Sequence, residues 1–240
     1  MATFVQTNVG LYWGGYSLAS SFNAIALNLG NSPQDDTVYG DTFVSNAAGL
    51  SSVQLEAEGF WESATDSVLQ SGLAINVADT VLSVTPVDQA AGSPSLFSKV
   101  TTSAYNPIST GTVGSMLGFS LSAEGRGEKS VSGEILVIPA TTHTSSSTSP
   151  VNNLGAVSAT QKIYSALHVI SASGTLAVTV KSASNEAFSA DVTTELTHTS
   201  VGSSVTAEML SAAGAITNTY WRVDFTISGS YQFIVSLGII

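Results

Sequence analysis

Residues 51–60, SSVQLEAEGF, alternate between two kinds of side chain with a period of two. Small and apolar residues occupy one set of alternate positions. The other set is polar, acidic or aromatic and contains Gln54, Glu56, Glu58 and Phe60. Successive side chains of an extended chain point to opposite faces of a sheet, so this pattern predicts a half-buried β-strand. The exposed face of that strand should carry closely spaced carboxylates.

A second segment, residues 116–123, shows the same period. Phe119, Leu121 and Ala123 fall on one face, and Ser120, Ser122 and the next residue along the chain, Glu124, fall on the other. Similar short runs recur along the chain, separated by stretches rich in Gly, Pro, Asn and Asp, which reverse the chain direction. We therefore expect an all-β protein. One short helix is expected at about residues 63–73, where Ser63 or Thr65 could cap it.

The chain is predicted to form two domains. Residues 140–155 are rich in Ser and Thr and lack a hydrophobic period, which is typical of a linker. This places an N-terminal domain at 1–139 and a compact β-sandwich at 156–240. Within the second domain, residues 219–227 and 231–237 are predicted to form a hairpin that turns at SGSYQ.

Charge limits the classes of partner. Only 10% of the 240 residues are charged, and the net charge is −11. Residues 1–140 hold 12 of the 17 acidic side chains and three of the six cations. Ordinary nucleic-acid binding uses Lys and Arg to neutralise phosphates, so neither DNA nor an anionic membrane is an expected ligand. The first residues lack the basic and apolar regions of a secretory signal, and no run of about 18 apolar residues occurs.

Few residues suggest catalysis or metal binding. The chain has no cysteine, and His143, His168 and His198 lack the short spacing of a zinc site. Asp35, Asp36 and Asp41 could supply oxygens to calcium, although a solvated acidic loop is the simpler interpretation. Glu56 and Glu58 could form a carboxylate pair about 7 Å apart, but no sugar-binding cleft accompanies them. We expect no catalytic residues, no metal site and no cofactor.

Aromatic residues leave sugar binding open as a second class of function. Trp13, Trp61 and Trp221 could stack on sugars if they were exposed, whereas core packing would explain them if they were buried. Quenching of their fluorescence by sugars would distinguish the two.

The N-terminal half resembles a known family. Residues 35–62, DDTVYGDTFVSNAAGLSSVQLEAEGFWE, resemble the major tail protein, or tail tube protein, of long-tailed bacteriophages. An acidic loop leads to a Gly-Leu turn and then to a strand that ends in Gly-Phe-Trp. The matching residues are Thr37, Gly40, Asp41, Gly49, Leu50, Val53, Leu55, Gly59, Phe60 and Trp61. Residues 117–136 are similar to a later strand pair of that family. The C-terminal part looks like an extra β-sandwich that some tail proteins carry.

The resemblance implies an N-terminal β-sandwich or split barrel with one flanking helix. Such subunits join edge to edge into hexameric rings, which stack into a virion tube that conducts DNA. It further implies a lumen lined by Gln54, Glu56, Glu58, Ser120, Ser122 and Glu124. Contacts between rings would involve Asp35, Asp36, Phe43, Val44 and Leu50.

The partners implied are further copies of the chain and other tail proteins, namely the tip or initiator and the terminator. DNA would pass without specific binding, no membrane would be involved, and the C-terminal domain could touch host-surface glycans weakly. Synthesis would take place in the host bacterial cytoplasm. The alternative is a decoration or adhesin-type module of the virion that binds such glycans.

Overall fold

The computed structural model describes residues 9–18, 22–31, 34–39, 42–44, 46–47, 51–60, 80–87, 89–106, 116–127, 129–139 and 141–240. In these ranges all regular structure is β-strand, which confirms the predicted all-β class. The helix predicted at about residues 63–73 lies outside the described residues. Within the described ranges, no helix has the length and apolar character needed to cross a membrane.

The chain forms two compact units that interleave in sequence. Unit 1 comprises residues 1–20, 80–99 and 131–240, and unit 2 comprises residues 21–79 and 100–130. This division differs from the predicted one, in which residues 1–139 formed a single domain. The N-terminal strands instead belong to the same unit as the whole C-terminal part.

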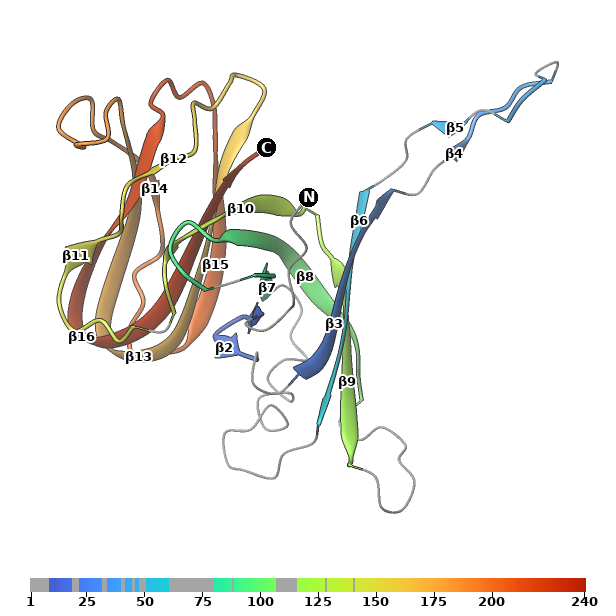
Figure 1. Ribbon diagram of the computed structural model, residues 1–240, viewed down its shortest axis with the longest axis horizontal. Helices are drawn as coiled ribbons and strands as arrows, with labels where there is room; N and C mark the ends of the chain where they lie inside the picture. Colours follow the sequence, from blue (N-terminus) through green and yellow to red (C-terminus); the bar gives the residue numbers. More distant parts are fainter. Residues whose placement is uncertain are drawn as a thin grey trace. The chain divides into compact units, whose positions relative to one another are not determined.

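Unit 2 contains a four-stranded antiparallel sheet in the order β3, β6, β9 and the end of β8. The strands are β3 (Phe22–Asn31), β6 (Ser51–Phe60), β9 (Gly118–Gly125) and β8 (Pro94–Asn106), of which residues 100–106 belong to this unit. Between β3 and β6, the short strands β4 (Gln34–Asp35) and β5 (Asn46–Ala47) pair as a narrow ribbon. Figure 1 shows this ribbon continuing outward from β3 and β6.

Unit 1 is built around two very long strands, β13 (Lys162–Ala183) and β16 (Tyr220–Ile239). They pair with each other along almost their whole length. The other strands of this unit are β1 (Gly10–Trp13), β2 (Tyr16–Ser17), β7 (Thr80–Thr85), β10 (Val131–Val137), β11 (Ser147–Thr148), β12 (Asn152–Asn153), β14 (Thr193–Thr197) and β15 (Thr206–Ala213).

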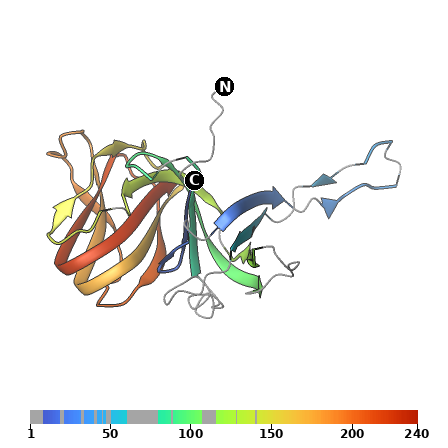
Figure 2. The same cartoon turned by 60° about the horizontal axis from the view of Figure 1, so that its bottom comes forward.

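The hairpin predicted at SGSYQ is wrong, because β16 continues through these residues without turning. Gly229 lies directly opposite Gly174 of β13, and both have positive φ values, 119° and 102°. A Cβ atom on Gly229 would lie 1.8 Å from the carbonyl oxygen of Ser173. Only glycine fits this close backbone approach, and the paired strands curve together along their length (Figures 1 and 2).

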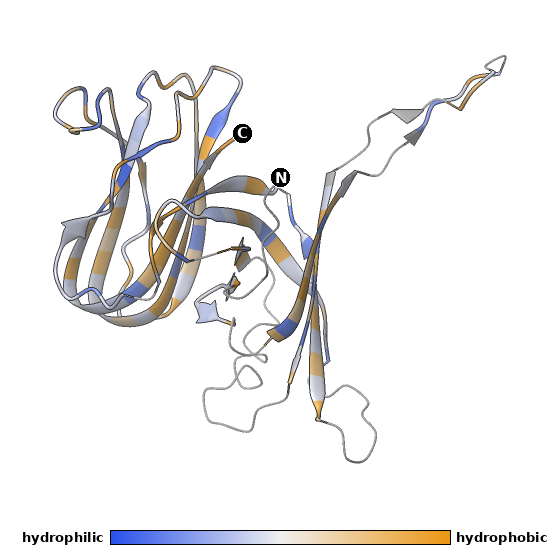
Figure 3. Cartoon of the chain, in the orientation of Figure 1, coloured by the Kyte–Doolittle hydropathy of each residue, from blue (hydrophilic) through white to orange (hydrophobic). Residues whose placement is uncertain are grey.

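Residues 162–169 of β13 are buried on both faces except at Lys162. On one face, Ile163, Leu167 and Val169 join the large core that also contains Trp221 and Phe233. On the other face, Tyr164 and Ala166 pack with residues of earlier strands, namely Val81, Phe97 and Val131. The N-terminal strands and the C-terminal strands of unit 1 therefore share β13 as a common core strand. Figure 3 shows apolar bands along β13 and β16.

The segment predicted as a linker, 140–155, packs on unit 1 where it is described. His143 bridges to Tyr231, β11 pairs with Phe225 and Asp224, and β12 pairs with Trp221 and Tyr220. The Ser and Thr side chains that suggested a flexible linker are thus placed along the edge of β16.

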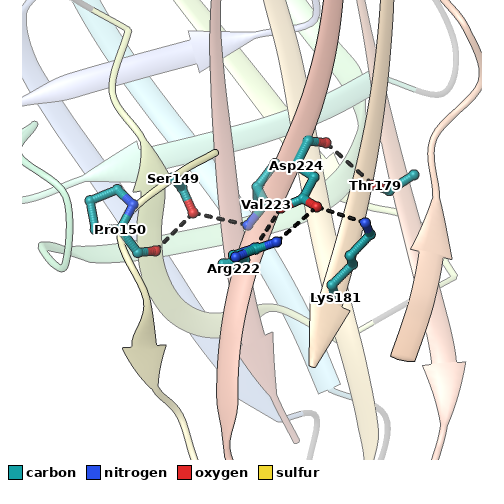
Figure 4. A network of polar contacts seen from close by, with 7 residues as sticks. All are labelled: Ser149, Pro150, Thr179, Lys181, Arg222, Val223 and Asp224. Carbon is teal, nitrogen blue, oxygen red and sulfur yellow. Dashed lines mark hydrogen bonds and ion pairs between the residues drawn. The ribbon is translucent and has the colours of Figure 1, made fainter. Parts of the chain in front are cut away.

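The two-faced pattern predicted for residues 220–227 is present. Trp221, Val223, Phe225 and Ile227 are buried, while the alternate residues are partly or fully exposed. On the outer face, the Asp224 carboxylate accepts hydrogen bonds from Arg222 and lies 2.7 Å from the Lys181 ammonium (Figure 4). Partial burial alone would raise the pKa of Asp224, but the hydrogen bonds and charges of Arg222 and Lys181 outweigh it and lower this pKa.

Candidate functional site

The acidic residues of β6 and the polar residues of β9 share one face of the unit 2 sheet. In the strand register, Gln54 lies opposite Glu124, Glu56 opposite Ser122 and Glu58 opposite Ser120. Directly opposed residues of an antiparallel pair point to the same side. The four residues Gln54, Glu56, Glu58 and Glu124 are exposed, and the two serines are half-buried. The structure therefore brings together the six residues predicted to line a lumen.

Small or neutral residues border this acidic face on both sides. On β3, Ala24, Ala26 and Asn28 lie opposite Glu58, Glu56 and Gln54. On β8, Thr101, Ala104 and Asn106 lie opposite Glu124, Ser122 and Ser120, and the Asn106 amide donates to the Ser120 hydroxyl at 3.2 Å. The described residues of β3, β6, β9 and 100–106 of β8 include no Lys or Arg. This face therefore presents the carboxylates of Glu56, Glu58 and Glu124, and the one cation of these four strands, Lys99 of β8, lies just before residue 100.

The reverse face of the same sheet is apolar. Val53, Leu55 and Ala57 of β6 are buried, as are Phe119, Leu121 and Ala123 of β9. The rings of Phe22 and Phe119 pack edge to face, with centroids 5.0 Å apart. Because burial of this apolar face fixes the strand orientation, the carboxylates are held on the opposite, solvent-facing side.

The β4–β5 ribbon carries the other predicted contact residues. Phe43 and Val44 are 84% and 73% exposed, and Val38 and Tyr39 beside them are also exposed. Asp35 and Asp36 are exposed at the base of the ribbon. Hydrogen bonds from Thr37, from its hydroxyl and its backbone N–H, lower the pKa of Asp35. Leu50 and Asp41 lie outside the described residues. Among the described residues, β4 and β5 pair over only two residues each, and an isolated two-stranded ribbon is marginally stable. Large exposed apolar side chains are typical of interaction surfaces.

The structure shows one arrangement that the sequence did not suggest: a Ser–His–Glu series in unit 1. The Ser165 hydroxyl lies 2.9 Å from Nε2 of His198, and Nδ1 of His198 lies 2.9 Å from the Glu208 carboxylate. Glu208 also accepts hydrogen bonds from the backbone N–H and the hydroxyl of Thr199. The three residues come from different strands and loops, so no spacing in the sequence marks them.

This series has the order of a hydrolytic triad but not its accessibility. The Ser165 side chain is fully buried, and His198 is nearly so. A neighbouring cavity of about 390 Å³ is lined by Glu208, Thr199 and Leu167 among others, and not by Ser165 or His198. A nucleophilic serine must reach its substrate, so the geometry favours a structural hydrogen-bond network.

His168 is a second buried histidine of unit 1 whose two ring nitrogens both make hydrogen bonds. Its Nδ1 atom lies 2.8 Å from the carbonyl oxygen of Gly14, and its Nε2 atom lies 2.7 Å from the Ser83 hydroxyl. A carbonyl only accepts, so Nδ1 carries the proton and Nε2 accepts from Ser83. Burial lowers the pKa of His168 to about 4. Neutral His168 therefore links β13 to β7 and to the turn after β1. Within the described ranges, no group of three His, Cys, Asp or Glu residues is placed to hold a metal ion.

Two of the three tryptophans are unavailable for stacking on a sugar. Trp13 and Trp221 are buried, and the Trp221 indole N–H donates to the carbonyl oxygen of Gly155 at 2.9 Å. Trp61 lies outside the described residues. For Trp13 and Trp221, core packing is the observed role.

No protein-family model and no curated protein matches this chain. Among solved structures, the SPP1 tail tube matches with a TM-score of 0.42 and 11% identity, covering 53% of this chain and 78% of that one. A chain of the native gene transfer agent virion matches with a TM-score of 0.36 and 11% identity, covering 45% and 82%. The SPP1 Dit protein, described as a hub adsorption apparatus, matches with a TM-score of 0.38 and 9% identity, covering 98% and 100%. These neighbours are described as a tail tube, a gene transfer agent virion and a hub adsorption apparatus, and the low scores assign the chain to no family.

Proposed function

We propose that this chain is a structural, non-enzymatic subunit of a phage tail. Copies of it assemble into stacked hexameric rings that form the tail tube, and the acidic face of unit 2 lines the DNA channel. The observation that supports this proposal is the face built from Gln54, Glu56, Glu58, Ser120, Ser122 and Glu124. It holds three carboxylates, and β3, β6, β9 and residues 100–106 of β8 contain no Lys or Arg.

Such a face suits a channel through which DNA slides. Carboxylates repel the phosphates of DNA, and the neighbouring serines and small residues carry no positive charge that would bind them. The Debye length is about 8 Å at physiological salt, so the repulsion acts only at short range. In a narrow channel that range is enough to keep the duplex from adhering to the wall.

The edge of the unit 2 sheet supports assembly into rings. Within the described part of the chain, β3 pairs with β6 alone, and we propose that the other edge of this ten-residue strand pairs with a strand of a neighbouring copy. Long unpaired edges are liabilities in a monomer, and closing a ring of sheets removes them. Pairing of β3 with a neighbouring copy would therefore continue the acidic face around the channel.

The β4–β5 ribbon is proposed to make the contacts between rings. Phe43 and Val44 would be buried against the next ring, at a gain of about 25 cal/mol per Å² of apolar surface. Asp35, Asp36 and Leu50 belong to the same segment and are included in this proposed contact. Other tail proteins, the initiator and the terminator, would begin and end the tube.

Electron microscopy of the purified protein at rising concentration tests the assembly. Stacked rings with a central hole are expected. Particles that stay monomeric, both alone and with a tail-tip complex added as initiator, would contradict the proposal.

The lumen is tested with Glu56→Lys and Glu58→Lys in assembled tails. Both variants should form tubes yet slow DNA ejection, because each lysine adds a phosphate contact in the channel. Glu186→Lys is the matched control, since Glu186 is exposed in unit 1 and the charge change is the same. Equal ejection rates for the three variants would place the acidic face outside the channel.

A further inference from the structure

The long strand β16 has its second edge covered by an irregular segment of its own chain. On one side β16 pairs with β13. On the other side, β16 pairs with β10 only near the C-terminal end of β16, from Val235 to Leu237. The rest of this edge is followed by residues 141–153, which we call the edge segment. It touches β16 at His143, at β11 and at β12, and so extends to Tyr220.

Serine side chains replace the missing backbone partners between these points. The backbone N–H of Val223 donates to the Ser149 hydroxyl at 2.9 Å, and the N–H of Ile227 donates to the Ser146 hydroxyl at 3.0 Å. In return, the N–H of Ser149 donates to the Val223 carbonyl oxygen at 2.8 Å. These side-chain bonds satisfy amides of β16 that would otherwise be open to pairing.

The His143 ring anchors the start of the edge segment. Its centroid lies 4.9 Å from that of Phe225 and 5.2 Å from that of Phe233, two aromatic residues of the large core. Backbone hydrogen bonds in both directions join His143 and Tyr231. The segment is therefore held by packing at one end and by the short β12 pairing at the other.

The outer side of the edge segment is a poor template for a further strand. Its sequence is THTSSSTSPVNN over residues 142–153, and most of these residues are exposed. Pro150 has no N–H to donate, and paired residues never exceed two in a row. On the far side of β13, two separate strands form the edge: β14, with five residues and a register shift in its pairing, and β15, with eight residues. Short, interrupted edges are the means by which β proteins avoid edge-to-edge association.

We propose that residues 141–153 act as an edge guard, which keeps β16 from pairing with a strand of a second copy of this chain. The guard directs strand-to-strand association away from unit 1. The inference does not depend on tube formation, since any soluble copy of this chain would need the guard.

The test removes the two hydroxyl groups in the full-length chain with Ser146→Ala and Ser149→Ala. Ser145→Ala is the matched control, because Ser145 is exposed in the same segment and is not bonded to β16. Hydrogen exchange at the Val223 and Ile227 amides should become about fivefold faster in the double variant, in line with loss of one hydrogen bond each. The control should exchange as the wild type does.

Association is measured on the same samples by light scattering and thioflavin fluorescence. The double variant should form thioflavin-positive assemblies at concentrations where wild type and control do not. Faster exchange without any change in association would overturn the proposal, as would unchanged exchange at both amides. If the double variant fails to fold, Ser146→Ala alone tests the Ile227 amide with a single bond lost. Failure of tube assembly by the wild type would be seen separately, as absence of rings in the microscope.

Discussion

Acidification should destabilise unit 1 through His168. This side chain is fully buried, and its neutral ring donates to Gly14 and accepts from Ser83. Burial lowers its pKa from 6.5 to about 4 in the folded protein. Between these pH values, His168 is therefore protonated in the unfolded chain and neutral in the folded chain. The stability that depends on neutral His168 is complete above pH 6.5 and is lost as the pH falls toward 4.

The magnitude follows from the two pKa values. The full difference corresponds to about 3 kcal/mol, at about 1.4 kcal/mol per pH unit. About 2 kcal/mol of this should be lost between pH 7 and pH 5, where only the unfolded form of His168 titrates. The pKa values of Glu208 and Asp224 are lowered, so the stability that these carboxylates contribute is lost at lower pH.

The assay is urea unfolding followed by tryptophan fluorescence at pH 7 and pH 5. Trp13 and Trp221 lie in the core of unit 1 and report on its unfolding. The variant His168→Gln keeps one donor and one acceptor but carries no charge at either pH. Its free energy of unfolding should fall by about 2 kcal/mol less than that of the wild type over this range.

The titration of two other histidines also has to be controlled for in this experiment. Burial also lowers the pKa values of His143 and His198, although the contacts of His198 with Glu208 oppose the effect. Their contribution is present in both wild type and His168→Gln, so it cancels in the difference. Equal losses of stability in the two proteins would refute the reasoning, because they would show that His168 is not held neutral by its surroundings.

Three further outcomes are expected. Gly229→Ala should destabilise unit 1 by at least about 2 kcal/mol in urea unfolding, since it combines a positive φ with a backbone clash; Gly202→Ala, which meets nothing within 4 Å, is the control and should change little. Phe43→Ser with Val44→Ser should abolish ring stacking in electron micrographs while leaving the monomer's unfolding midpoint unchanged, because both side chains are exposed; a drop in that midpoint would show that they stabilise the monomer. In a Trp61→Phe variant, emission should be blue-shifted and resistant to acrylamide and to added sugars, and strong quenching would contradict the burial of the two remaining tryptophans.

The sequence by itself determined the strand faces, because the period of two is a local property of an extended chain. The alternation in residues 51–60 and 118–124 placed Glu56, Glu58, Ser120 and Ser122 on the polar side before any register was known. Burial of the apolar side then keeps that face in place. The low charge and frequent turn residues likewise indicated an all-β chain.

Only the tertiary structure decided which strands are neighbours and where the chain divides. A glycine gives the same local signal in a turn and in a close approach of two strands, so the sequence around Gly229 predicts a turn. Its partner in the structure, Gly174, is distant in sequence. The Ser- and Thr-rich segment, residues 140–155, would lack an apolar period both as a flexible linker and as a segment packed along the edge of β16. The contacts of His168 and His198 join separate strands. Such pairings depend on long-range packing, which no local pattern of residues encodes.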